Sequence, residues 1–134
     1  TLMNQFMRSE HTFMVEANAP EYDAYFQQYV IGKLYAVVGM RYHSNIFSAK
    51  MGTPFVSISY EQKMKGFMEK MGLDEYCIPI ENLTLKQLES TFAKMNTNYP
   101  TYKKRLQEKH SQMKEDSHKT TEAVLDLLEQ NNVE

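Results

Sequence analysis

Hydrophobic and polar positions change along this chain in a way that predicts alternating strands and helices. Residues 35–40 form a short apolar run rich in β-branched side chains, which is typical of a buried strand. Polar residues follow at 41–45, and apolar positions then recur at helical spacing up to Gly52, where a Gly-Thr-Pro sequence favours a helix end. Residues 55–59 predict a second strand. This strand–helix–strand unit is the centre of the predicted fold, because such a unit joins parallel strands.

The segments on either side continue the alternation. Residues 11–16 and 76–80 predict two more strands, and Pro79 indicates that the second of these lies at or near a sheet edge. Further helices are predicted at 1–9, from Pro20 to Gly32, from Met64 to Met71, after Thr84 with its capping-box pattern, and from Thr101 to about Gln130. We therefore predict an α/β fold, a Rossmann-like parallel sheet of about four strands flanked by helices, with a long C-terminal helix.

For two of these helices, the sequence also predicts how they lie against the rest of the domain. The helix from Pro20 has large apolar side chains at helical spacing, and we expect this stripe to face the core: Tyr22, Tyr25, Phe26, Tyr29 and Val30. The terminal helix is rich in charge, and polar residues such as Lys109 and His110 interrupt the apolar seam that a coiled coil needs. We expect this helix to lie across the domain.

Composition narrows the class of protein. The chain has 134 residues, enough for one domain, with 42% hydrophobic residues, 24% charged residues and a net charge of −2. Lysine and arginine are scattered, so we expect no nucleic-acid partner. No apolar stretch approaches the roughly 18 residues that indicate a membrane span, so no transmembrane segment is predicted. Cys77 is the single cysteine, which excludes an internal disulfide and favours a reducing cytoplasm.

Polar side chains gather where the predicted strands of the central unit end. They are Arg41, His43, Ser44 and Asn45 after the first strand, and Tyr60 and Lys63 after the second. Ligands of open parallel sheets bind at this edge, because the free N–H groups and the dipole of the following helix attract anions. The residues alone also allow an ordinary ion pair for Arg41, a histidine with satisfied hydrogen bonds at a helix start for His43, and a solvated first helical turn for Lys63. No dinucleotide fingerprint, P-loop or metal-ligand pattern is present in the sequence.

Three linked blocks at consistent spacing resemble the polysaccharide pyruvyl transferase family. They are Gly39-Met-Arg-Tyr-His43, Phe47-Ser-Ala-Lys-Met-Gly-Thr-Pro54 and Ser57-Ile-Ser-Tyr-Glu-Gln-Lys63, followed by Met71-Gly72-Leu73 where the family has Leu-Gly-Leu. The resemblance covers residues 30–80 and implies a two-domain architecture similar to GT-B glycosyltransferases. Residues 1–134 would then be an incomplete, single C-terminal Rossmann-like domain, with the N-terminal domain missing.

The resemblance also implies an activity in polysaccharide biosynthesis. Members of the family transfer pyruvate from phosphoenolpyruvate to two hydroxyls of a saccharide acceptor as a ketal, with phosphoenolpyruvate as donor substrate and no cofactor. This implies a cytoplasmic protein that works at the inner face of the membrane where polysaccharide precursors are made. Ser44 and Asn45 depart from the small apolar residues expected after the family's histidine, and both can cap a helix or bond an oxyanion.

The expected residue roles follow from the chemistry of the donor. A phosphate and a carboxylate need a fork-shaped donor, which we assign to Arg41, and further contacts from Ser44, Asn45, Tyr60 and Lys63. Ketal formation needs a proton on the enol carbon and loss of phosphate. A bound dianion favours protonated histidine, so we assign the catalytic acid to His43, acting with Arg41.

Two other classes of function remain open at this point. A half-domain of a nucleotide-sugar glycosyltransferase or epimerase would use the same helix start for a diphosphate. A non-catalytic binding or assembly domain would use the C-terminal helix as its interface. We also expect a tendency to form homo-oligomers, because an incomplete sheet leaves a strand edge or an apolar helix face uncovered.

Overall fold

The computed structural model describes residues 23–131, and its centre is a three-stranded parallel sheet. The strands are β1 (Val37–Gly39), β2 (Phe55–Ser59) and β3 (Cys77–Pro79), in the order β1-β2-β3. This confirms the predicted α/β class and the parallel sheet, and it places Pro79 on an edge strand as expected. The helix predicted at 1–9 and the strand predicted at 11–16 lie outside the described residues.

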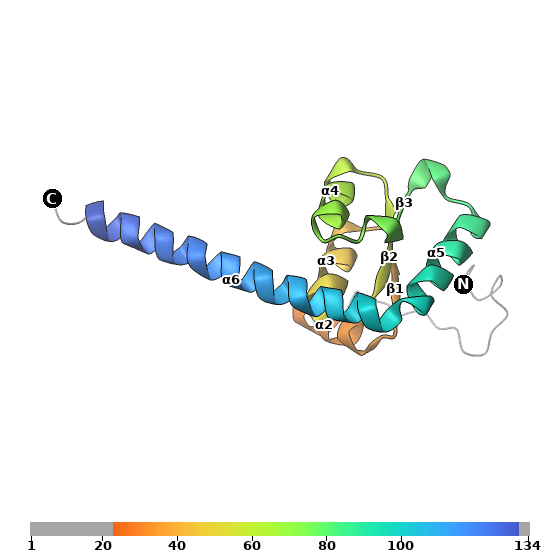
Figure 1. The fold of residues 1–134 in the computed structure, drawn as a ribbon, viewed down its shortest axis with the longest axis horizontal. Coiled ribbons are helices and arrows are strands. Elements are labelled where there is room, and N and C mark those ends of the chain that lie inside the picture. Colours follow the sequence, from red (N-terminus) through yellow and green to blue (C-terminus); the bar gives the residue numbers. More distant parts are fainter. Residues whose placement is uncertain (1–22, 132–134) are drawn as a thin grey trace.

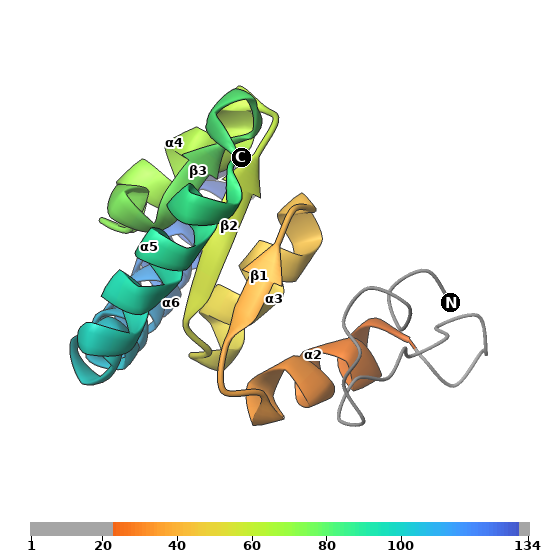
Figure 2. The same cartoon turned by 90° about the vertical axis from the view of Figure 1, so that its right-hand side faces the viewer.

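Helices cover both faces of the sheet (Figures 1 and 2). They are α2 (Ala24–Lys33), α3 (Tyr42–Met51), α4 (Gln62–Lys70), α5 (Leu85–Thr97) and α6 (Tyr99–Asn131), with short 3-10 turns η1 (Asp74–Tyr76) and η2 (Ile80–Asn82). In Figure 1 the sheet is seen nearly edge-on, with α3 and α4 on one side and α5 on the other. The long helix α6 crosses below the sheet and continues past the side that carries α3 and α4.

Local sequence accounts for the helix ends. Gly52 adopts the left-handed conformation with φ 73°, and the N–H of Thr53 bonds to the carbonyl of Ser48 at 2.9 Å, so α3 ends where the Gly-Thr-Pro sequence predicted. At the start of α5, the Thr84 hydroxyl accepts a hydrogen bond of 3.1 Å from the N–H of Gln87. This is the first half of the predicted capping box.

The core lies between the sheet and the helices that cover it. Its fully buried side chains are those of Phe55, Val56, Met68, Leu73, Tyr76, Ile78, Met95, Tyr102 and Leu106. The Tyr102 hydroxyl donates a hydrogen bond of 2.6 Å to the carbonyl of Phe55, which fixes the first turn of α6 at the amino end of β2. Burial raises the pKa of Tyr102 above its ordinary value. The start of α6 therefore lies at the end of the sheet opposite to the carboxyl edge.

The aromatic stripe of α2 does not face the core, so that expectation was wrong. Tyr25 is 80% exposed and Tyr29 is 61% exposed, while Tyr22 lies outside the described residues. The helix packs on α3 through a different side, where Thr53 donates a 2.9 Å hydrogen bond to the carbonyl of Ile31. Because β1 is the edge of the described sheet, no described strand lies beyond it to cover the aromatic side.

The terminal helix is confirmed, but only its first half lies against the rest of the domain. Tyr102 and Leu106 are buried, whereas Met113 and Leu127 are exposed. Figure 1 shows the second half of α6 extending well beyond the rest of the described chain. The prediction that the helix lies across the domain was therefore right for its first turns and wrong for its end. No helix between residues 23 and 131 has both the length and the apolar character that a membrane crossing requires.

Candidate functional site

The junction between β1 and α3 places the predicted site residues at the carboxyl edge of the sheet. β1 ends at Gly39, and Arg41 occupies the position before the helix with an extended backbone, φ −86° and ψ 143°. No side chain caps this helix start, so its first N–H groups are available to a ligand. The Arg41 side chain is exposed, and it forms no ion pair within residues 23–131.

Asn45 holds this junction together from inside. Its side chain is fully buried, and Nδ2 donates to the Gly39 carbonyl at 3.3 Å and to Ser57 Oγ at 3.1 Å. These bonds connect the first turn of α3 to the ends of both β1 and β2. Gly39 is needed here because a Cβ at this position would collide with Asn45 Oδ1 and lie 2.9 Å from Ser44 Oγ. The Asn45 side chain thus lies beneath the helix start and not on its surface.

Ser44 also bonds locally. Its hydroxyl donates a hydrogen bond of 2.7 Å to the carbonyl of Arg41, and it is partly exposed. This contact closes the first turn of α3 and fixes the backbone that carries Arg41. Ser44 can reach a ligand only by exchanging this bond or by accepting a hydrogen bond on its free lone pair.

Tyr42 links His43 to Lys63, and sequence reasoning did not single it out. The His43 ring is exposed and meets the Tyr42 ring edge-on, with 6.0 Å between the centroids. Lys63 Nζ, from the first turn of α4, lies 4.2 Å from the centroid of the same Tyr42 ring, within the range of a cation–π contact. Arg41, His43 and Lys63 are therefore grouped around the start of α3, as the parallel strands required.

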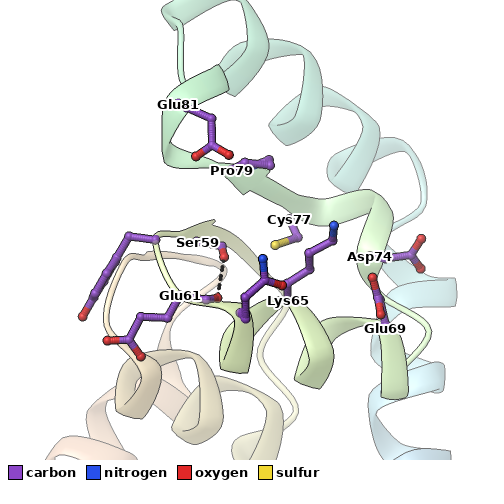
Figure 3. Close-up of a pocket in the computed structure, with 10 residues that line it drawn as sticks. Ser59, Glu61, Lys65, Glu69, Asp74, Cys77, Pro79 and Glu81 are labelled. Carbon is purple, nitrogen blue, oxygen red and sulfur yellow. Dashed lines mark hydrogen bonds between the residues drawn. The ribbon is translucent and has the colours of Figure 1, made fainter.

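A cavity of about 310 Å³ lies at the neighbouring junction, between the carboxyl ends of β2 and β3 and the start of α4 (Figure 3). Its lining is Ser59, Tyr60, Glu61, Gln62, Lys65, Glu69, Asp74, Cys77, Pro79 and Glu81. Figure 3 shows Lys65 rising from α4 toward Cys77, while Glu81 points down from the opposite side. Of the predicted site residues, this cavity contains Tyr60 and none of those around Arg41.

The charges in this cavity do not suit a dianion. Four carboxylates line it against one lysine, so a phosphate would meet net repulsion there. Burial raises the pKa of the Cys77 thiol, which keeps it protonated at neutral pH and a poor nucleophile. Sequence reasoning missed the cavity because its residues are spread from Ser59 to Glu81 over several elements. The signal that the sequence offered was that Ser59, Tyr60, Pro79 and Glu81 stand at the ends of strands or just after them.

The described part of the chain contains no group of side chains that could form a metal centre. Between residues 23 and 131, no three His, Cys, Asp or Glu side chains are grouped closely enough to hold a metal ion. The Arg41 guanidinium and the free N–H groups at the start of α3 are hydrogen-bond donors, which suit an anion.

Comparison with known proteins identifies the central unit. Residues 19–62 match the family model described as polysaccharide pyruvyl transferase, a stretch that contains β1, α3, β2 and all the predicted site residues except Lys63. A 46-residue stretch is 44% identical to the amylovoran biosynthesis protein AmsJ of Erwinia amylovora. This stretch covers 34% of the present chain and only 11% of that relative. No solved structure matches the chain significantly.

The family match and the fold agree on the same part of the molecule. The matched stretch ends where α4 begins, so it contains the whole junction at which Arg41, His43 and Asn45 are brought together. Over residues 19–62, this chain is similar to the polysaccharide pyruvyl transferase family.

Proposed function

We propose that this chain is part of a polysaccharide pyruvyl transferase that moves pyruvate from phosphoenolpyruvate onto two hydroxyls of a saccharide as a ketal. The observation that carries the proposal is the coincidence of the family match with an uncapped helix start that exposes Arg41 and His43. A relative named for amylovoran biosynthesis supports a polysaccharide as the product class.

In this proposal the start of α3 binds the anionic donor. Arg41 has no described ion-pair partner, so its guanidinium is available for two parallel hydrogen bonds to the carboxylate or the phosphate. The free N–H groups of the helix start and the Lys63 ammonium add positive potential on the same side. Ser44 and Tyr60 are assigned polar contacts to the ligand, and Asn45 holds the two strand ends in place beneath it.

His43 is proposed as the acid. Its exposed ring follows Arg41 by two residues, and a bound dianion favours the protonated imidazole. The proton goes to the enol methylene carbon, and the first saccharide hydroxyl adds to the resulting electrophilic carbon. The C–O bond to phosphate then breaks and the second hydroxyl takes its place, while one hydroxyl proton returns to His43 and the other leaves with the phosphate. A positioned acid of this kind contributes about 10²–10⁴-fold to the rate.

The whole enzyme is proposed to need more than residues 1–134. We assign these residues to a C-terminal Rossmann-like domain of a two-domain, GT-B-like transferase whose other domain supplies the acceptor side of the cleft. The match to only 11% of the relative's length is consistent with this division. On this proposal the enzyme acts in the cytoplasm, at the inner face of the membrane, and the present chain alone is inactive.

Steady-state kinetics of the complete enzyme test the proposal. Arg41→Lys should raise KM for phosphoenolpyruvate although it keeps the charge, because a lysine ammonium cannot form the bidentate contact. His43→Ala should lower kcat by about 10²–10⁴-fold. Lys65→Ala is the matched control, since Lys65 lines the neighbouring cavity, and it should leave KM for the donor unchanged.

The outcomes separate the competing functions. If a nucleotide sugar is consumed and phosphoenolpyruvate is not, the glycosyltransferase or epimerase alternative is correct. A complete protein that consumes neither donor supports a binding or assembly domain. Near-normal kcat in His43→Ala would show that the histidine is only part of the helix start.

A further inference from the structure

The projecting half of α6 has an apolar face without a partner in the described chain. Exposed fractions lie between 45% and 59% for Met113, Val124, Leu125, Leu127 and Leu128. Met113 and Val124 are eleven residues apart, about three helical turns, so they lie on one side of the helix. This side continues the face that buries Tyr102 and Leu106 at the start of α6.

The two halves of α6 carry opposite charge. Residues 99–114 contain five basic and one acidic side chain, whereas residues 115–131 contain one basic and five acidic side chains. In the projecting part of α6, Lys109 and Lys114 precede the acidic residues, so an antiparallel copy places these two lysines along its acidic end, whereas a parallel copy places like charges together. The pattern is self-complementary, as a two-fold symmetric interface requires.

A groove beside the basic half offers the apolar face a place to dock. It has a volume of about 290 Å³ and is lined by Ile46, Ala49, Lys50, Phe67, Met71, His110, Met113 and Lys114. Its floor is apolar and comes from α3 and α4, and its rim carries Lys50, Lys114 and His110. The end of α6 matches this groove because its leucines suit the apolar floor and its acidic residues suit the basic rim. Since α6 is straight, this end points away from the groove of its own chain (Figure 1).

We propose that two copies of this chain pair through antiparallel α6 helices. With Met113 of one copy opposite Val124 of the other, the two-fold axis falls between residues 118 and 119. Lys109 and Lys114 then lie along the acidic stretch 122–129 of the other copy, and Leu127 and Leu128 reach the groove between α3, α4 and α6. The paired segment, residues 106–131, is about 39 Å long.

This pairing is independent of the proposed activity. α6 starts at the amino end of β2, where Tyr102 bonds to Phe55, and the candidate site lies at the carboxyl edge. Neither Arg41 nor His43 lines the groove that the second copy is proposed to occupy. A failure of the pairing would not bear on the pyruvyl transferase proposal, and the reverse also holds.

Charge-reversal variants of the whole chain test the proposal by sedimentation equilibrium. The wild type should be a dimer. Lys109→Glu/Lys114→Glu removes both basic residues between positions 106 and 114, so that both ends of the paired segment are acidic, and Asp126→Lys/Glu129→Lys leaves residues 115–131 with three basic and three acidic side chains. Each variant alone should therefore be monomeric. An equimolar mixture should restore the dimer, because both contacts are then between opposite charges. Circular dichroism of each variant checks that the helix content is retained.

A disulfide test fixes the direction of pairing. In a Cys77→Ser background, Met113→Cys/Val124→Cys should form a covalent dimer on mild oxidation. Val124→Cys alone should not, because two copies of that position lie about 16 Å apart along antiparallel helices. A monomeric wild type at high concentration, or a mixture of the two charge variants that stays monomeric, overturns the proposal. Cross-linking by Val124→Cys alone would show a parallel pair and overturns it equally.

Discussion

The two strand–helix junctions of this sheet occupy equivalent positions and carry opposite chemistry. At the β1–α3 junction, Arg41 and His43 are exposed cationic or titratable groups above a buried amide, and the helix start is uncapped. At the β2–α4 junction, a cavity of about 310 Å³ is lined by four carboxylates, one lysine and a protonated thiol. Parallel topology decides where a ligand can bind, and the side chains of each junction decide which ligand it is.

The junctions also differ in how tightly they are packed. Asn45 bonds to Gly39 and Ser57 in a space that has no room for an added methyl group. In α4, a Cβ built at Gly66 meets nothing within 4 Å. Rigid support beneath Arg41 suits a site that must hold a small anion in one orientation. The following experiments compare the two junctions directly.

Replacing Gly39 at the β1–α3 junction and Gly66 on the exposed side of α4 should give the largest contrast. Gly39→Ala forces its Cβ against Asn45 and Ser44, and we expect it to lower the free energy of unfolding by about 1–3 kcal/mol, as overpacking usually does. Gly66→Ala, in an exposed helix position, should raise it by about 0.5–1 kcal/mol. Urea unfolding followed by circular dichroism measures both. A small effect of Gly39→Ala would mean that the β1–α3 junction has room for an added methyl group.

Much of the fold and part of the candidate site could be predicted from the sequence, and particular residues show which features could not. The three described strands and the turn at Gly52 were predicted correctly because β-branched runs and Gly-Thr-Pro are local signals. The grouping of Arg41, His43 and Lys63 followed from parallel topology alone. The burial of Asn45 could not be predicted, because it depends on Ser57, twelve residues away on the next strand.

The prediction that the aromatic stripe of α2 faces the core was wrong for a related reason. Helical spacing predicts which side chains share a face, and Tyr25 and Tyr29 do share one. Spacing does not show whether another element covers that face, and in the described chain both side chains are exposed. The same limit applies to α6, whose apolar end has the spacing of a packed helix without a described partner.

Two serines on the same strand give a smaller test of the comparison. Ser57 Oγ accepts the buried hydrogen bond from Asn45, so Ser57→Ala should cost about 1 kcal/mol of unfolding free energy. Ser59 Oγ donates 3.1 Å to the carbonyl of Glu61, beside the open cavity, where water can replace it. Ser59→Ala should therefore cost less than half as much. The reverse order in thermal or urea unfolding would contradict the assignment of Asn45 as the structural link.

The single cysteine reports on the β2–α4 cavity as a function of pH. Burial raises the pKa of Cys77, so the thiolate fraction at pH 8 is lower than in the unfolded chain and increases only as the pH rises further. Iodoacetamide should alkylate the native protein several-fold more slowly than the urea-unfolded protein at pH 8, with the difference shrinking above the native pKa. Mass spectrometry of timed samples measures both rates. Faster alkylation of the native protein would show an activated thiol.

Anion binding should distinguish the junctions by the smallest and most specific effect. Phosphate that binds the native state raises its stability by RT ln(1 + [L]/Kd), which is about 0.4 kcal/mol when the phosphate concentration equals Kd. For a domain of this size, such a gain raises Tm by about 1–2 °C.

Arg41→Ala should abolish the shift because it removes the unpaired guanidinium at the α3 start, whereas Lys65→Ala should preserve it because carboxylates surround that lysine. Sodium chloride at matched ionic strength controls for screening. The same shift in both variants would mean that phosphate acts as a general salt, and loss of the shift in Lys65→Ala alone would move the anion site to the β2–α4 cavity.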